Sequence, residues 1–98
     1  MELITQEESY PALYKTEDIK TDEKMLYLRF YEQSSGWEWY LSEYDPDDEI
    51  AFGYVRGFES EWGYFSITEM QGIPTIKRDY EFEPTKFKEL YKKIRESR

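Results

Sequence analysis

Apolar and polar residues alternate along two stretches in the first half of the chain, residues 25–31 and 37–44. The apolar positions of these stretches are Leu26, Leu28, Phe30, Trp37, Trp39 and Leu41. A period of two is typical of a β-strand that buries one face. The segment 34–36 between them ends in Gly36, which is free to adopt the positive φ of a hairpin turn. The pattern therefore predicts a β-hairpin.

The strand pattern continues beyond this hairpin. Asp45 and Pro46 open the sequence Asp-Pro-Asp-Asp, and Asp followed by Pro favours a type I turn. Residues 50–55 then predict a third strand and residues 62–65 a fourth, while residues 75–82 alternate loosely and are a candidate fifth. We expect the first three strands to form an antiparallel meander.

Helical signals are of two kinds. Ser66 and Glu69 match a capping box, which predicts a short helix from Ile67. Near the C-terminus, apolar residues follow the spacing i, i+3, i+4, i+7 of an amphipathic helix. These residues are Phe87, Leu90, Tyr91 and Ile94. In the polar N-terminal part, residues 5–24, we expect only a turn or a short helix.

Together these elements predict a single domain over residues 1–98 of the α+β class. We expect an antiparallel sheet of four or five strands in a meander, a C-terminal amphipathic helix packed on one face, and one or two short helices. The length of 98 residues suits one domain. Hydrophobic residues make up 39% of the chain and aromatic residues 19%, which is too much for a disordered acidic tail.

Histidine and cysteine are both absent from the sequence. Their absence excludes the commonest general base, thiol nucleophiles and the commonest zinc ligands. Glu59 and Glu61 remain as a carboxylate pair, which would support acid–base chemistry only if burial raised the pKa of one of them. We favour a solvated edge for this pair. We therefore predict that the protein is not an enzyme, with no catalytic residue, cofactor or metal.

The net charge of −9 is unevenly distributed. Residues 84–98 contain six basic and two acidic side chains, a net +4, which leaves −13 on residues 1–83. Such a field disfavours direct DNA binding by the acidic body and binding to an anionic membrane. The sequence begins without the basic and apolar regions of a signal peptide, and no apolar run approaches the roughly 20 residues that span a bilayer. We therefore predict a cytoplasmic protein.

Three aspartates, Asp45, Asp47 and Asp48, lie in the predicted turn. Clustered carboxylates suit calcium, but an EF-hand loop starting at Asp45 needs Gly at its sixth position and Glu at its twelfth. The chain has Ile50 and Arg56 there. We favour an acidic turn without metal, and keep the three aspartates as candidate binding residues.

Four tyrosines alternate with the apolar positions of the first two strands: Tyr27, Tyr31, Tyr40 and Tyr44. If the apolar residues face the core, these tyrosines share the opposite sheet face with Glu38. Tyrosine combines rigid apolar area with a polar tip, as recognition surfaces do. The alternative is that the N-terminal segment covers this face, and both interpretations remain open. The candidate binding residues are thus the four tyrosines, Glu38 and the three aspartates.

Several aromatic and glycine blocks resemble a family of uncharacterised bacterial domains found in short proteins of plasmids, phages and other mobile elements. The blocks are Trp-Glu-Trp-Tyr at 37–40, Glu-Tyr-Asp-Pro at 43–46, Phe-Gly-Tyr-Val-Arg-Gly-Phe-Glu at 52–59 and Trp-Gly-Tyr-Phe-Ser at 62–66. Similar outer motifs lie at 11–14 and 78–84, so that the match covers roughly residues 10–85. The resemblance implies a bacterial or phage origin and assigns no activity to any residue.

Two functions are consistent with these features. The first is a non-enzymatic protein-binding module of a bacterial mobile element or phage, whose protein partner is unidentified. The alternative is an acidic mimic of nucleic acid that inhibits a host DNA-binding or defence enzyme, as anti-restriction and anti-CRISPR proteins do. A mimic predicts an elongated surface with carboxylates in rows at phosphate-like spacing.

Overall fold

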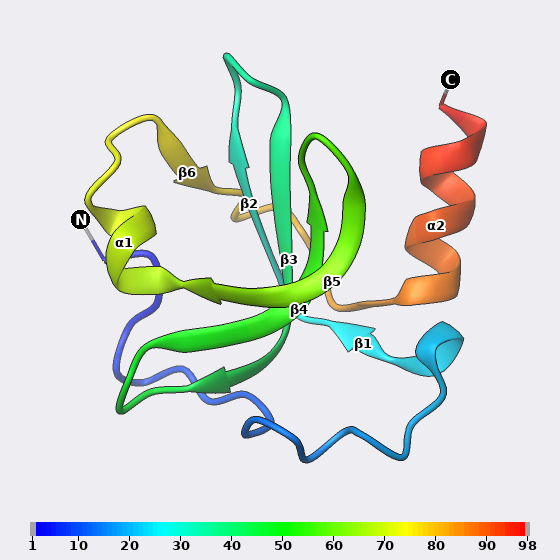
Figure 1. The fold of residues 1–98 in the computed structure, drawn as a ribbon, viewed down its shortest axis with the longest axis horizontal. Coiled ribbons are helices and arrows are strands. Elements are labelled where there is room, and N and C mark those ends of the chain that lie inside the picture. The colour runs from blue at the N-terminus through cyan, green and yellow to red at the C-terminus, as the bar shows by residue number, and fades with distance from the viewer. Residues whose placement is uncertain (1, 98) are drawn as a thin grey trace.

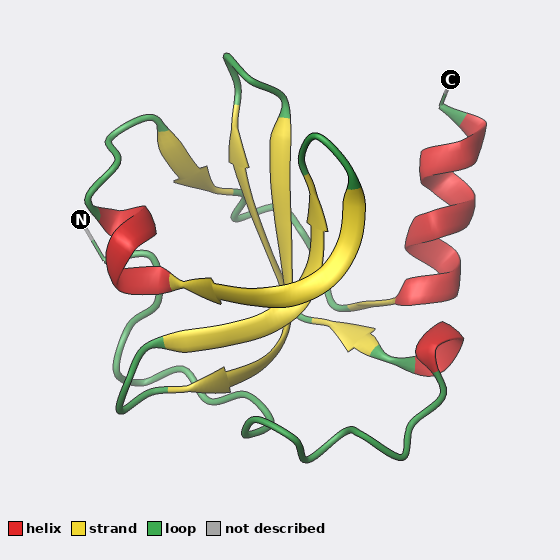
Figure 2. Ribbon diagram, in the orientation of Figure 1, coloured by secondary structure: helices red, strands yellow, loops and turns green. Residues whose placement is uncertain are grey.

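The structure, a computed structural model, describes residues 2–97. Its elements are the 3₁₀ turn η1 Thr21–Glu23, β1 Met25–Leu26, β2 Leu28–Glu32, β3 Trp37–Asp45, β4 Ile50–Arg56, β5 Ser60–Ser66, α1 Ile67–Gln71, β6 Ile76–Arg78, β7 Thr85–Lys86 and α2 Phe87–Glu96. The main sheet is antiparallel with the strand order β5-β4-β3-β2-β6, and a small sheet pairs β1 with β7. Figure 1 shows α1 and α2 on opposite sides of the strands, and Figure 2 marks the helices and strands. This architecture confirms the predicted α+β class and meander.

The predicted local signals form the predicted turns and caps. Gly36 adopts a φ of 80° in the turn between β2 and β3. At the next turn, the Asp45 Oδ1 accepts a hydrogen bond of 2.9 Å from the Asp47 backbone N–H. The Ser66 hydroxyl oxygen accepts one of 3.1 Å from the Glu69 N–H at the start of α1. Each of these contacts is local, which explains why the sequence predicted them.

The strands depart from the prediction in two places. The alternating stretch 25–31 is interrupted at Tyr27, so that β1 joins the small sheet and β2 the main sheet. The predicted fifth strand, residues 75–82, is only the three-residue β6, which pairs with β2. A β-bulge also shifts the register of β3 against β4 between Leu41 and Glu43. The interruption and the bulge both change which side chains share a face.

Apolar side chains cover both faces of the main sheet. The first core lies under α1 and the N-terminal segment, and comprises Leu3, Ile4, Leu28, Phe30, Leu41, Tyr44, Ala51, Phe65, Ile67, Met70 and Ile76. The second core lies under α2, and comprises Leu26, Tyr40, Tyr54, Phe87 and Leu90. Packing on both faces stabilises a chain too short to build one large core.

The C-terminal helix packs on the sheet as its apolar stripe predicted. Phe87 and Leu90 are buried in the second core and Ile94 packs against it, while Tyr91 remains 43% exposed. Nowhere along residues 2–97 does a helix have the length and apolar character needed to cross a bilayer.

Candidate functional site

The predicted common tyrosine face does not form. Because the bulge reverses the alternation of β3, Tyr44 lies on the same face as Leu41, in the first core, whereas Tyr40 lies in the second core. Both are buried, with exposures of 7% and 3%. Tyr27 packs against the first core with its ring 5.7 Å from Tyr10. The expectation that these residues share one face is therefore wrong, and Tyr40 and Tyr44 present little surface to a partner.

Glu38 lies at the centre of an ion-pair network on the α2 side of the sheet. Its carboxylate is 2.7 Å from Arg29 and 2.5 Å from Arg56, and it accepts a hydrogen bond of 2.9 Å from the Tyr40 hydroxyl. Arg29 also pairs with Asp79 at 3.0 Å. Burial opposes ionisation of Glu38, but the hydrogen bonds and positive charges of its partners outweigh it, so the pKa of Glu38 is lowered.

The same network determines the surroundings of two of the candidate tyrosines. Burial and the adjacent Glu38 carboxylate raise the pKa of Tyr40 to about 12. The guanidinium of Arg29 lies 4.9 Å from the centre of the Tyr31 ring. Two arginines balance Glu38 and Asp79, so this cluster is electrically neutral and its groups bind one another. We assign it a structural role.

The three candidate aspartates of the β3–β4 turn lie apart from these tyrosines. Asp45 accepts hydrogen bonds from the backbone within the turn, and Asp47 and Asp48 are exposed at its tip. Over residues 2–97, no group of three or more acidic side chains is arranged to hold a metal ion. The turn thus satisfies its own backbone groups.

The strand β5 forms one edge of the main sheet. It is seven residues long and pairs on one side with β4. Within residues 2–97, no backbone or side-chain group of another segment is hydrogen-bonded to the outward side of the segment 60–65. A free edge presents unpaired N–H and C=O groups that pair readily with another strand.

Two hydrogen bonds at the ends of the β4–β5 pair show which backbone groups of β5 point outward. The Gly57 N–H donates to the Glu59 oxygen at 3.1 Å, and the Ile67 N–H donates to the Glu49 oxygen at 2.9 Å. Both pairs continue the β4–β5 register, in which hydrogen-bonded and non-hydrogen-bonded pairs alternate. The odd-numbered residues of β5 therefore bond to β4.

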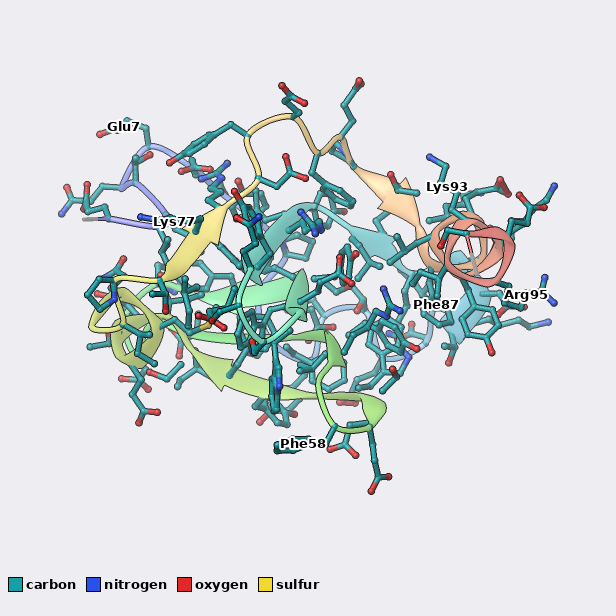
Figure 3. The ribbon with its side chains drawn as sticks, turned by 90° about the horizontal axis from the view of Figure 1, so that it is seen from above. Glu7, Phe58, Lys77, Phe87, Lys93 and Arg95 are labelled. Atoms are coloured by element: carbon teal, nitrogen blue, oxygen red, sulfur yellow. The ribbon has the colours of Figure 1, made fainter. Side chains whose placement is uncertain are left out.

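It follows that Trp62 and Tyr64 direct their backbone N–H and C=O groups away from the sheet. Their side chains lie on the α2 face, whereas the side chains of Glu61 and Phe65 lie on the first-core face. Figure 1 shows β5 crossing the front of the molecule, and Figure 3 shows the same strand along its lower border beside Phe58. The edge is thus accessible along its length.

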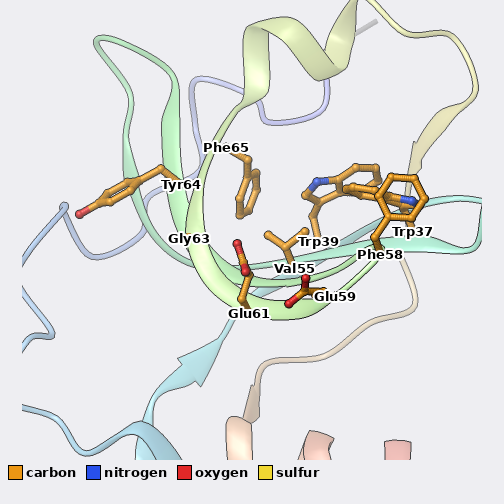
Figure 4. Close-up of a pocket in the computed structure, with 9 residues that line it drawn as sticks. All are labelled: Trp37, Trp39, Val55, Phe58, Glu59, Glu61, Gly63, Tyr64 and Phe65. Atoms are coloured by element: carbon orange, nitrogen blue, oxygen red, sulfur yellow. The ribbon is translucent and has the colours of Figure 1, made fainter.

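A pocket of about 390 Å³ opens beside this edge on the first-core face. The Trp37 ring centre lies 5.8 Å from that of Trp39 and 5.4 Å from that of Phe58, with Phe58 edge-on at 84°. Figure 4 shows these three rings grouped together, the carboxylates of Glu59 and Glu61 beside them, and Tyr64 pointing away. We call this site the aromatic pocket. It is lined by Trp37, Trp39, Val55, Phe58, Glu59, Glu61, Gly63, Tyr64 and Phe65.

Two glycines shape the aromatic pocket. A Cβ atom at Gly57 would lie 2.5 Å from the Trp37 ring, so the absence of a side chain lets the indole lie against the backbone of the β4–β5 turn. A Cβ atom at Gly63 would meet nothing within 4 Å. Gly63 therefore leaves open space where a larger residue would fill the pocket.

Phe58 is the most exposed large apolar side chain of the described residues, at 96%. An aromatic ring held in water beside other aromatic rings is typical of a binding surface. Glu59 and Glu61 are also exposed, and within residues 2–97 neither carboxylate takes part in an ion pair or hydrogen bond. The pocket therefore combines accessible aromatic area with negative charge that the described part of the chain does not neutralise.

Aromatic side chains also line the opposite face of β5. The Tyr64 ring centre lies 6.4 Å from Tyr14 and 5.0 Å from Phe52, and Phe52 stacks on Trp62 at 5.9 Å. Tyr64 is 55% exposed. We call Tyr14, Tyr64, Phe52 and Trp62 the aromatic strip. An extended segment beside β5 would thus find aromatic surface on both of its faces.

The N-terminal segment is fixed beside this strip by Glu43. This buried carboxylate accepts hydrogen bonds from the backbone N–H groups of Tyr14 at 2.8 Å and Thr16 at 3.0 Å, and from the Thr16 hydroxyl. The bonds hold the chain where Tyr14 has a φ of 71°. Glu43 therefore positions the Tyr14 ring against Tyr64.

A larger hollow of about 740 Å³ lies at the other edge of the sheet, beside β6. Its side chains include Arg78, which lies 4.8 Å from the centre of the Tyr80 ring and forms an ion pair of 2.8 Å with Glu8. Glu32, also at this hollow, accepts hydrogen bonds from Ser34 and Ser35 in its own turn. Arg78 and Glu32 are thus engaged by groups of the chain itself, and the β6 edge is short, so we favour the β5 edge as the candidate site.

Reasoning from the sequence missed this site. Trp37 and Trp39 occupy the predicted core-facing positions, but each is only half-buried because α1 and the N-terminal segment cover the other end of that face. Phe58 follows Gly57 between two predicted strands. A large aromatic residue in a predicted turn is the one feature of the sequence that indicates this site. That β5 is an edge depends on strand order, which the alternation does not encode.

Comparison of the chain with protein-family models, with curated proteins and with solved structures finds no match.

Proposed function

We propose that the protein is a binding module that takes an extended segment of another protein alongside β5 by strand addition. The observation that supports this proposal is the free edge of β5 with accessible aromatic surface on both faces. In strand addition, main-chain hydrogen bonds provide affinity and side-chain pockets provide specificity. Trp62 and Tyr64 offer the main-chain groups, and the aromatic pocket and the aromatic strip offer the side-chain contacts.

Two observations favour binding over the other functions. Within residues 2–97, the carboxyl groups of Glu8, Glu23, Glu32 and Glu38 have lowered pKa values, because hydrogen bonds and positive charges favour their ionised form. A carboxylic acid that donates a proton near neutral pH needs a raised pKa. The molecule measures 34 × 33 × 23 Å, which is not the elongated shape expected of a nucleic-acid mimic.

The resemblance to small proteins of mobile elements adds a proposal about context. On this proposal the partner is a bacterial protein met in the cytoplasm during the life of a plasmid or phage. The module needs no cofactor and no metal for this activity, because hydrogen bonds and apolar contacts supply the affinity.

Strand addition is tested with peptides of about seven residues, the length of β5, selected from a random library displayed on phage. Proline at position 64 removes an outward N–H without removing a bond to β4, since edge strands tolerate proline at such positions. We expect Tyr64→Pro to weaken binding of the selected peptides at least about tenfold relative to Tyr64→Val, measured by fluorescence anisotropy. Tyr64→Val is the matched control because it loses the same ring and keeps the N–H.

A second measurement does not depend on the folding of the proline variant. In the wild-type protein, a bound peptide should slow hydrogen exchange at the Trp62 and Tyr64 amides, which point outward and have no partner among residues 2–97. The effect should be smaller at the Gly63 amide, which already bonds to β4. Equal affinity for the proline and valine variants, unchanged exchange at these amides, or a library that yields no binder would each contradict the proposal.

A further inference from the structure

We infer that the segment bound alongside β5 must be basic, with a lysine or arginine side chain inserted into the aromatic pocket. This inference rests on the proposed function and names the chemistry of the partner. Three features support it: the reach that the pocket demands, the aromatic rings that line it, and its two unpartnered carboxylates.

The position of the pocket demands a long side chain. It extends from Gly63 on β5 across Val55 on β4 to Trp39 on β3. Neighbouring strands lie about 4.8 Å apart, so a side chain from a strand added outside β5 must cross about 5 Å to lie over Gly63 and must extend further to approach β4. The open space above Gly63 provides the path. Lysine and arginine are long and unbranched, and their methylene groups pack on apolar surface while the charged end projects further.

The chemistry of the pocket selects a positive charge. Trp37, Trp39 and Phe58 present aromatic rings, and a cation over an aromatic face is attracted by its quadrupole. Glu59 and Glu61 add negative charge at the same site, and no described cation neutralises them. A cationic side chain is complementary to both, whereas an acidic side chain would be repelled.

The same charges disfavour a second copy of this chain as the occupant. Each copy has a net charge of −9, so two copies repel each other. Pairing two β5 edges would bring two sets of Glu59 and Glu61 together, and like charges on adjacent strands are destabilising. A partner with a basic extended segment meets no such repulsion.

The experiment is a double-mutant cycle on a library-selected peptide that contains lysine. Replacing that lysine with norleucine keeps the unbranched chain and removes the charge. We expect at least about a tenfold loss of affinity for the wild-type protein, and a loss below about twofold for the Glu59→Gln, Glu61→Gln double variant. The Asp47→Asn, Asp48→Asn double variant is the matched control, because it changes the net charge equally at a remote turn and should behave as wild type.

The outcomes separate this inference from the proposed function. Two results overturn the basic specificity. The first is that the selected peptides share no lysine or arginine. The second is that replacing lysine with norleucine weakens binding equally for the wild-type protein and for the Glu59→Gln, Glu61→Gln double variant. If Tyr64→Pro still abolishes binding in that case, strand addition stands with a different side chain in the pocket. If the norleucine peptide loses equally little affinity for the glutamine and the asparagine double variants, the attraction is a long-range effect of net charge only. That result would also overturn the inference.

Discussion

The two edges of the main sheet differ in length, charge and covering. β5 has seven residues, contains neither lysine nor proline, and has accessible aromatic side chains on both faces. β6 has three residues, two of which are Lys77 and Arg78, and Pro74 lies just before it. Short length, basic side chains and proline are the usual means of preventing an edge from pairing with another chain.

The β6 edge is also tied to the N-terminal segment. Arg78 donates a hydrogen bond of 3.0 Å to the Leu3 carbonyl and pairs with Glu8 at 2.8 Å. Nothing comparable reaches β5 from the described residues. One edge of this sheet is therefore protected by its own chain and the other is left available, a difference expected if β5 serves for binding. Substitutions at β6 should then affect folding, and substitutions around β5 should affect binding.

The largest effect on stability is expected for Arg78→Met at the β6 edge. The variant loses the contacts to Leu3 and Glu8 and leaves a partly buried carboxylate without its partner. We expect the free energy of unfolding in urea to fall by about 3 kcal/mol. A fall below about 0.5 kcal/mol, within the range of ordinary surface substitutions, would show that Arg78 does not fasten this edge.

A smaller loss of stability is expected when the pH is lowered. The hydrogen bond from Arg78 lowers the pKa of Glu8 to about 2, from an ordinary value of 4.5. A carboxyl with a lowered pKa in the folded state stabilises the protein above pH 4.5, and this stabilisation is lost as the pH falls toward 2. We expect the loss to be roughly 2 kcal/mol in urea titrations at a series of pH values. Glu8→Gln should remove this part of the pH dependence, and an unchanged profile would contradict the assignment.

At the β5 edge, Gly63→Leu should block binding without loss of stability. The added side chain enters space where no atom lies within 4 Å of a Cβ. We expect at least about a tenfold loss of peptide affinity, with the free energy of unfolding unchanged within about 0.5 kcal/mol. Gly63→Ala is the control, since a methyl group leaves most of the pocket open. If Gly63→Leu binds the peptide with wild-type affinity, the peptide does not use the aromatic pocket.

The smallest expected change is that of Phe58→Ala. Phe58 is 96% exposed, so its removal should change the melting temperature by no more than a few degrees. Because the ring forms one side of the aromatic pocket, we expect about a fivefold loss of affinity for a lysine-containing peptide. A stability loss above about 1 kcal/mol would show that Phe58 serves packing rather than binding.

The sequence predicted the fold more closely than the site. The β2–β3 turn at Gly36, the cap at Ser66 and the apolar stripe from Phe87 to Ile94 all formed as expected, because each depends on residues a few positions apart. The candidate tyrosines failed as a group because the prediction extended one alternation through Tyr27 and beyond Leu41. A one-residue irregularity in a strand reverses the face of every side chain that follows.

The sequence by itself determined the two α-helices, the strands β3 to β5 and the turns between them, together with the negative charge that makes a basic partner favourable. Only the tertiary structure decided which faces are covered and which strand is left at an edge. The bulge in β3 lies where β4 approaches so closely that a Cβ atom at Gly53 would be 1.7 Å from the Tyr40 carbonyl oxygen. Such a contact arises only between strands already paired. Alternation describes one strand, whereas exposure depends on the distant segments that pack against it.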